Sequence, residues 1–485
     1  MDDIEIEGRN YDLSTIKQFQ LQIEHNVKDP SSQSKITYAL HTLLTIFVLA
    51  KMAGATDCQR IYTFWNLNVR KLQSLIYGLG KEVPTPQTIK RCVTILEEHN
   101  LINFFTKIFL DFYTKGACQY NKGETPALEK RDVIGADGQN IRATNGKYIT
   151  ENGKLRTKTG YDIVSLFSTQ YGLTLCQQVV DKKNQEAKAI GEMLEIINVR
   201  NSILAWDALN TRPKLLDQVV KCGADFLVVI KGNNGNSEEE IEDCFYFLDA
   251  HPKHPFNDEK ISATRHDAGH GRVETRTIEA LPIECMSKTF RKTWPYVNSV
   301  IRVVTNRCEK REGKCSEETQ SVNYYISSLI IDHDDERYAE KLQNIILSRW
   351  KIESTLHYQI DMFFDQDRIP LRNQDYIKNS TCLTKISHNI LSYIRKQIQD
   401  QTKRAPSIPT LQTLCNDVEI GFAFMSAYVY DDLEHLKDIE ILYNMFFKRL
   451  EVVEERQVEI VVKEEPIEFE LQKYIKKRKA KPKKE

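Results

Sequence analysis

The chain has 485 residues, of which 41% are hydrophobic and 28% charged, and its formal net charge is −1. This length favours about two to four folding units with sizeable cores, and the balanced charge gives no sign of a protein that coats nucleic acid. The most apolar stretch, residues 43–50, is far shorter than the roughly 20 residues of a membrane span. Residues 1–20 lack the apolar segment of a secretory signal. The eleven cysteines form no CxxC pair, which favours a reducing cytoplasm over a disulfide scaffold.

Residues 1–115 show apolar positions at three- and four-residue spacing, with helix-start signals at Ser14 and Thr85-Pro86. We expect a separate, all-helical N-terminal domain here. One of its helices carries Thr88, Lys90 and Arg91 in its first turns, as a helix that reads a DNA groove would. A solvated amphipathic helix is the alternative interpretation.

The hydrophobic period changes to that of strands from residue 132 onward. Short runs rich in Val, Ile, Leu and Phe occupy 132–136, 161–169, 173–181, 202–208 and 225–231, and helical patterns occupy 186–198 and 212–221. Three strands followed by helix, strand, helix, strand is the order of the ribonuclease H-like fold. The sequence therefore predicts an α/β catalytic core at 130–400, with the fourth strand parallel to the first and beside it.

The later segments predict additions to this core. An acidic helix at 237–249 and alternating stretches at 273–278, 299–305 and 323–330 indicate a strand-rich insertion at about 235–332. Long helices are expected at 335–364 and 376–396, followed by a helical C-terminal extension at 401–450. Residues 451–485, which end in KKRKAKPKKE, have the charge blocks of a disordered tail.

Two aspartates are placed to bind metal. Asp137 ends the first predicted strand, and Asp207 lies in the otherwise apolar fourth strand, where an unpaired carboxylate would be costly to bury. Neighbouring strands lie about 5 Å apart, so both side chains can reach one ion. Phosphoryl transfer on DNA needs an activated attacking oxygen and a neutralised leaving oxygen, which two metal ions provide. For either aspartate alone, a turn or a helix cap is the simpler interpretation.

Glu353 shares a predicted helix face with Arg349 and His357, which lie four residues before and after it. A cation, an acid and an imidazole therefore line up along one helix. Without further context, this pattern is also that of a solvated ion-pair ladder.

Several motifs occur together in a fixed order. They are the Asp-Gly strand end at 134–138, Ala-Trp-Asp-Ala at 205–208 with the run at 223–233, Gly-His-Gly-Arg-Val-Glu-Thr-Arg at 269–276, Tyr-Tyr-Ile-Ser-Ser-Leu at 324–329, and Trp-Lys-Ile-Glu at 350–353. With these motifs the chain resembles DDE-type insertion-sequence transposases, in particular the group of H-repeat-associated proteins. The resemblance extends from about residue 29 to residue 396.

The resemblance implies a bacterial, nucleoid-associated DNA transposase whose triad Asp137, Asp207 and Glu353 holds two Mg²⁺ ions, with Mn²⁺ as a substitute. It implies cleavage and 3′-hydroxyl strand transfer at the ends of an insertion sequence, on double-stranded element and target DNA. It also implies a homodimer or larger assembly, with Arg349 and His357 in supporting roles. Departures from the family pattern are Gln139 in place of Lys, Asn210 in place of Gly, and Ile346 and Ile360 in place of Tyr and Lys.

Further candidate DNA contacts come from basic residues beside the expected site. We assign this role to Lys147, Lys154, Arg156 and Lys158 between the first two strands, and to Lys231 and Arg272. Solvated loops are equally consistent with these residues. Two alternatives to an active transposase also remain: a nonenzymatic DNA-binding protein derived from one, and a structure-specific nuclease on the same fold.

Overall fold

The computed structural model describes residues 5–6, 9–10, 13–27, 38–76, 79–96, 101, 126–149, 155–158, 160–180, 185–269, 272–311, 314–315, 318–368, 373–430 and 434–448. The tail predicted for 451–485 and the candidate DNA contact Lys154 lie outside these ranges.

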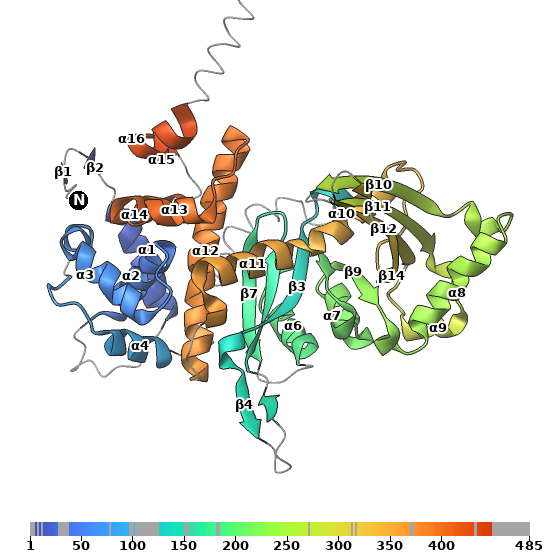
Figure 1. The fold of residues 1–485 in the computed structure, drawn as a ribbon, viewed down its shortest axis with the longest axis horizontal. Coiled ribbons are helices and arrows are strands. Elements are labelled where there is room, and N and C mark those ends of the chain that lie inside the picture. The colour runs from blue at the N-terminus through green and yellow to red at the C-terminus, as the bar shows by residue number, and fades with distance from the viewer. Residues whose placement is uncertain are drawn as a thin grey trace, which may run out of the picture.

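A ten-stranded mixed sheet forms the centre of the molecule, in the order β10-β11-β12-β14-β9-β8-β3-β6-β7, with β13 paired to β12 (Figure 1). The first five predicted strands are β3 (Val133–Asn140), β6 (Asp162–Ser168), β7 (Leu173–Val180), β8 (Ile203–Ala205) and β9 (Asp225–Ile230). β3 runs antiparallel to β6 and parallel to β8. The predicted parallel pairing of the first and fourth strands is therefore confirmed.

The strand-rich segment continues the same sheet. Its strands are β10 (Ile261–Gly269), β11 (Arg272–Pro282), β12 (Ser299–Arg311), β13 (Lys314–Cys315) and β14 (Thr319–Ser327). β14 pairs antiparallel with β9, so the chain returns from the added strands directly onto the core. Helices α8 (Ser237–Ala250) and α9 (Lys288–Thr293) accompany these strands. Cys308 on β12 is disulfide-bonded, a feature that the preference for a reducing cytoplasm over a disulfide scaffold did not anticipate.

Helices cover both faces of the core strands. Alternate side chains of β3 point to one face or the other and so contact different helices. Ile134 and Ala136 pack toward α6 (Glu186–Leu194) and α7 (Pro213–Lys221), whereas Val133 packs with α10 (Tyr338–Arg349). Successive strand residues point to opposite faces. Asp137 therefore shares the face of Val133, toward α10.

The predicted long helix at 335–364 is interrupted. α10 ends at Arg349, a π-helical segment η8 follows over Ile352–His357, and α11 continues over Tyr358–Phe364. Short π-helical insertions of this kind are frequent at functional sites. The interruption was not visible in the sequence because the apolar spacing of Ile352, Leu356 and Ile360, all fully buried, is that of an ordinary α-helix.

The N-terminal and C-terminal helices share one hydrophobic core with the long helix α12 (Gln374–Thr402), which lies between them and the sheet (Figure 1). The other helices are α1 (Leu13–Asn26), α2 (Leu40–Met52), α3 (Cys58–Leu75), α4 (Pro86–Thr94), α13 (Ile408–Leu414), α14 (Val418–Tyr430), α15 (Glu434–Lys437) and α16 (Glu440–Leu442). Two short strands, β1 (Glu5–Ile6) and β2 (Arg9–Asn10), precede α1 and depart from the all-helical expectation. Across the described ranges, no helix combines the length and apolar character needed to cross a membrane.

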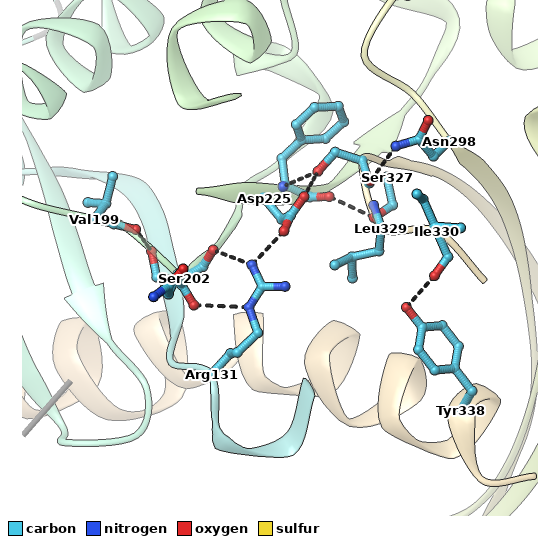
Figure 2. Close-up of polar contacts among 12 residues, drawn as sticks. Arg131, Val199, Ser202, Asp225, Asn298, Ser327, Leu329, Ile330 and Tyr338 are labelled. Carbon is cyan, nitrogen blue, oxygen red and sulfur yellow. Dashed lines mark hydrogen bonds and ion pairs between the residues drawn. The ribbon is translucent and has the colours of Figure 1, made fainter. Parts of the chain in front are cut away.

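Arg131 ties together the ends of three core strands opposite the expected site (Figure 2). Its Nε donates to the carbonyl of Asn201, and its Nη2 donates to the carbonyl of Ser202 and lies 2.5 Å from Asp225 Oδ2. Ser328, which follows β14, donates to the other oxygen of Asp225 at 2.6 Å. One buried guanidinium thus joins β3, β8 and β9 and, through Asp225, the strand that closes the added segment.

Lys385 on α12 is a fully buried cation on the same face as Asp137. Its Nζ donates to Ser165 Oγ at 2.5 Å, and Ser165 is the cross-strand partner of Asp137. Burial lowers the pKa of Lys385 to about 7, although the nearby Cys382 and Cys176 raise it.

The buried amine makes a testable contribution to stability. Above the folded-state pKa the native protein holds Lys385 neutral while the unfolded chain keeps it protonated up to about pH 10.4, so wild-type stability should rise across this interval. Lys385→Met should lack that rise. Thermal melts at about pH 7 and about pH 9.5, with exposed Lys396→Met on the same helix as the control, measure the difference. Parallel pH profiles of wild type and Lys385→Met would contradict this assignment.

Candidate active site

Asp137 and Asp207 lie at the same edge of the sheet, which we call the site edge. The last parallel pair of β3 and β8 is Gly135 with Ala205. Asp137 and Asp207 each lie two residues beyond their member of this pair. Asp207 Oδ1 accepts a hydrogen bond of 2.8 Å from the N–H of Ala208, which fixes the carboxylate at the strand end. The register therefore carries both aspartates toward the same end of the β3–β8 pair. Two details of the prediction were wrong, because Asp137 lies within β3, which continues to Asn140, and Asp207 lies beyond the end of β8.

Glu353 reaches the site edge from the helix packed over β3. A Cβ on Gly135 would lie 3.4 Å from the Cβ of Ile352, so the absence of a side chain there lets this helix approach the strand closely. Arg349 Nη1 lies 3.6 Å from Glu353 Oε1, as the predicted spacing requires. Arg349 is itself buried and its guanidinium lies over the Trp350 ring, 4.3 Å from the ring centre.

The electrostatics of Asp137 show that acidic groups converge on it. Burial, followed by the negative charges of Glu353 and Glu186, raises the pKa of Asp137 to about 7, while the N–H of Gly138 and the charge of Arg349 oppose the rise. The surplus of negative charge fits divalent cations, whose charge would favour the ionised carboxylates.

His357 faces Asp137 as a neutral imidazole. Its Nδ1 lies 3.6 Å from Asp137 Oδ2, and burial, with the charge of Lys385, lowers the pKa of His357 to about 3. Its Nε2 is buried without a hydrogen-bond partner in the described structure. His357 therefore places a neutral polar side chain beside Asp137 and adds no positive charge that would offset the charge of the carboxylates.

Lys231 lies at the site as well, because its Nζ is 3.6 Å from Asp207 Oδ1. Two of the three triad carboxylates therefore have a cationic neighbour: Lys231 lies beside Asp207, and Arg349 lies beside Glu353. Within the described ranges, no three His, Cys, Asp or Glu side chains are grouped closely enough to hold one metal ion together. The three carboxylates of the triad share one edge of the sheet without forming a closed three-ligand cage.

Two acidic residues near the triad were missed from the sequence. Glu186 opens α6 and accepts a hydrogen bond of 2.8 Å from Asn210. Asp361 on α11 accepts one of 2.7 Å from Gln139, and burial, followed by the charge of Asp367, raises the pKa of Asp361 to about 6. Glu186 could have been identified from its position in the sequence. It begins the helix that follows the third predicted strand, and that strand ends at the site edge.

The same contacts give a role to two of the four departures from the family pattern, Gln139 and Asn210. Gln139 lies on β3, two residues after Asp137. Its amide links two side chains, because it donates to Asp361 and accepts a hydrogen bond of 3.3 Å from Gln366 Nε2. Asn210 joins the loop after Asp207 to Glu186. Both amides therefore hold acidic or polar neighbours of the site in place.

The other candidate DNA contacts lie apart from one another. Thr88, Lys90 and Arg91 lie on α4, among the N-terminal helices on the far side of α12 from the sheet (Figure 1). The backbones of Lys147, Arg156 and Lys158 belong to the hairpin of β4 (Gly146–Ile149) and β5 (Leu155–Lys158), which projects beyond the sheet (Figure 1). Arg272 is exposed at the start of β11. Among the candidates whose side chains the structure describes, only Lys231 forms an ion pair with a triad residue.

Comparison with protein families gives a direct match. The model of the transposase DDE domain matches residues 129–390, more than half of the chain, and a model described as DDE_Tnp_1-associated matches residues 22–108. The first match spans all three residues of the predicted triad. The chain therefore belongs to the transposase DDE domain family.

Relatives place the chain more narrowly. YncI of Escherichia coli O157:H7, named as a transposase, is 26% identical over 82% of this chain and 94% of its own length. YhhI of Escherichia coli K12, named as an H repeat-associated transposase, is 25% identical over 74% of this chain and 86% of its own length. The predicted relation to the H-repeat-associated group is thus confirmed. A piggyBac transposase synaptic complex with hairpin DNA shares 10% identity and a TM-score of 0.35, over 87% of this chain and 79% of that chain.

Proposed function

We propose that this protein is a metal-dependent DNA transposase that cleaves the ends of its own insertion sequence and joins the exposed 3′ hydroxyl to target DNA. The proposal is supported by the parallel register of β3 and β8, which leads to Asp137 and Asp207, by the charge of Glu353 acting on Asp137, and by membership of the transposase DDE domain family. The order β7-β6-β3-β8-β9 supports a ribonuclease H-like core.

The carboxylates divide the binding of two divalent ions among them. Asp137 would contribute to both ions, and Asp207 and Glu353 would each contribute to one. A three-ligand cage would not be needed, because Mg²⁺ takes one or two carboxylates and keeps several waters. The ions would supply activation of the attacking oxygen and neutralisation of the leaving oxygen. Arg349 holds Glu353 in position, and Lys231 holds Asp207.

The rest of the chain supplies DNA contacts and assembly. We assign DNA-end binding to the N-terminal helices of residues 1–115, catalysis to 130–400 with its insertion at about 235–332, and a packing role to 401–450. Two element ends must be cut, so two copies of the chain are expected on DNA. Arg91, which is exposed on α4, and the basic residues of the β4–β5 hairpin are assigned to phosphate contacts.

The test is a cleavage and strand-transfer assay on DNA that carries the terminal inverted repeats flanking the coding sequence. We expect cleavage and joined products with Mg²⁺ or Mn²⁺, and neither with a chelator. Binding without cleavage would indicate a nonenzymatic DNA-binding protein. Cleavage of branched DNA without joining would indicate a nuclease on the same fold.

A further inference from the structure

Glu186 contacts both the strand that carries Asp137 and the short turn that follows Asp207. A Cβ on Gly138 would lie 2.6 Å from Glu186 Oε1, so this carboxylate packs directly against the backbone that follows Asp137. Its other oxygen accepts the hydrogen bond of 2.8 Å from Asn210, three residues after Asp207. The bare backbone of Gly138 is what makes room for the carboxylate.

The position of Glu186 follows from the topology. β7 runs parallel to β3, because each is antiparallel to β6, so the chain leaves β7 at the site edge. α6 then begins at Glu186 and runs back along the sheet toward β8. The first turn of α6 is therefore held at the site edge by the strand order.

Glu186 has no cationic partner among the described residues. Its one hydrogen-bond donor there is the neutral amide of Asn210, whereas Glu192 farther along the same helix lies 3.4 Å from Lys188. A glutamate that served only to anchor Asn210 could be replaced by glutamine, since an amide oxygen accepts the same hydrogen bond. An unneutralised carboxylate packed against Gly138, the residue after Asp137, can also bind a cation, which an amide cannot do by charge.

We propose that Glu186 is a fourth carboxylate of the active site, which binds or orients the divalent cation beside Asp137. The inference rests on the proposed function, since it concerns the same ions. The hydrogen bond from Asn210 aims the carboxylate, and Asp137, Asp207 and Glu353 remain the principal metal ligands. Such supporting groups typically change metal affinity by about 10- to 100-fold.

Mn²⁺ binding to the DNA-free full chain, measured by titration calorimetry, tests the proposal without relying on activity. We expect Glu186→Gln to weaken Mn²⁺ binding about tenfold, with the charge-retaining Glu186→Asp closer to wild type. Glu192→Gln, on the same helix, is the matched control and should bind as wild type does. Glu186→Ala also removes the charge and should show the same loss of Mn²⁺ affinity. It provides the test if Glu186→Gln does not fold.

The outcomes separate this inference from the proposed function. If Asp137→Asn loses Mn²⁺ binding while both Glu186→Gln and Glu186→Ala bind as wild type does, Glu186 has no part in the cation site and only this inference fails. If Asp137→Asn binds Mn²⁺ as wild type does, the proposed metal site itself is wrong. Equal losses in Glu186→Gln and Glu192→Gln would also overturn the proposal, because the effect would then belong to the helix as a whole.

Discussion

Asp137→Asn is expected to lower strand cleavage by on the order of a thousandfold or more, because the variant loses the one carboxylate assigned to both metal ions. The amide keeps the size of the side chain and its place beside the N–H of Gly138, so the strand should fold normally. DNA binding should stay close to wild type, since affinity for DNA comes mainly from Lys and Arg contacts to phosphates. End-labelled DNA carrying one element end measures both quantities.

Asp243→Asn on α8 is the matched control for this variant, because it makes the same chemical change at an exposed position away from the site edge. It should cleave at the wild-type rate. A wild-type rate for Asp137→Asn would show that the nucleolytic centre lies elsewhere. Loss of DNA binding together with cleavage would instead indicate that Asp137 maintains the fold.

The parallel pairing of the strands that lead to Asp137 and Asp207 could be predicted because local information is sufficient for it. The strands that carry them have clear apolar runs, and the order of strands and helices between them places the fourth strand beside the first. Glu353 was harder, because its spacing from Arg349 and His357 fits any solvated helix. The family motif, now supported by the domain match over 129–390, selected it.

Other features depend on contacts between distant parts of the chain, which periodicity does not encode. Glu186 matters only because α6 starts at the site edge and because Gly138 leaves room for its carboxylate. The common core of the N-terminal helices with α12 and α14 joins segments hundreds of residues apart. The π-helical turn that carries Glu353 keeps the apolar spacing of an α-helix, so periodicity could not reveal it.

Arg131→Met should lower the free energy of unfolding by about 3 kcal/mol, the cost of removing one partner from a buried ion pair. The expected loss is at the lower end of the range for such pairs, because the side chain of Asp225 is 30% exposed whereas that of Arg131 is only 6% exposed. The carbonyls of Asn201 and Ser202 also lose their donor. Urea denaturation followed by tryptophan fluorescence measures the change, with Trp206, fully buried beside Asp207, as an internal reporter.

Exposed Arg291→Met on α9 is the control and should change stability by no more than about 0.5 kcal/mol. The double variant Arg131→Met with Asp225→Leu should recover part of the loss, because no charge is then left without its partner. Equal stability of wild type and Arg131→Met would show that the three strands are held by their apolar contacts alone. Since Arg131 fixes the ends of β3 and β8 opposite the site edge (Figure 2), a loss of stability should be accompanied by weaker Mn²⁺ binding. A cation site formed by residues on adjacent strands depends on the register between those strands, and Arg131 helps to set that register.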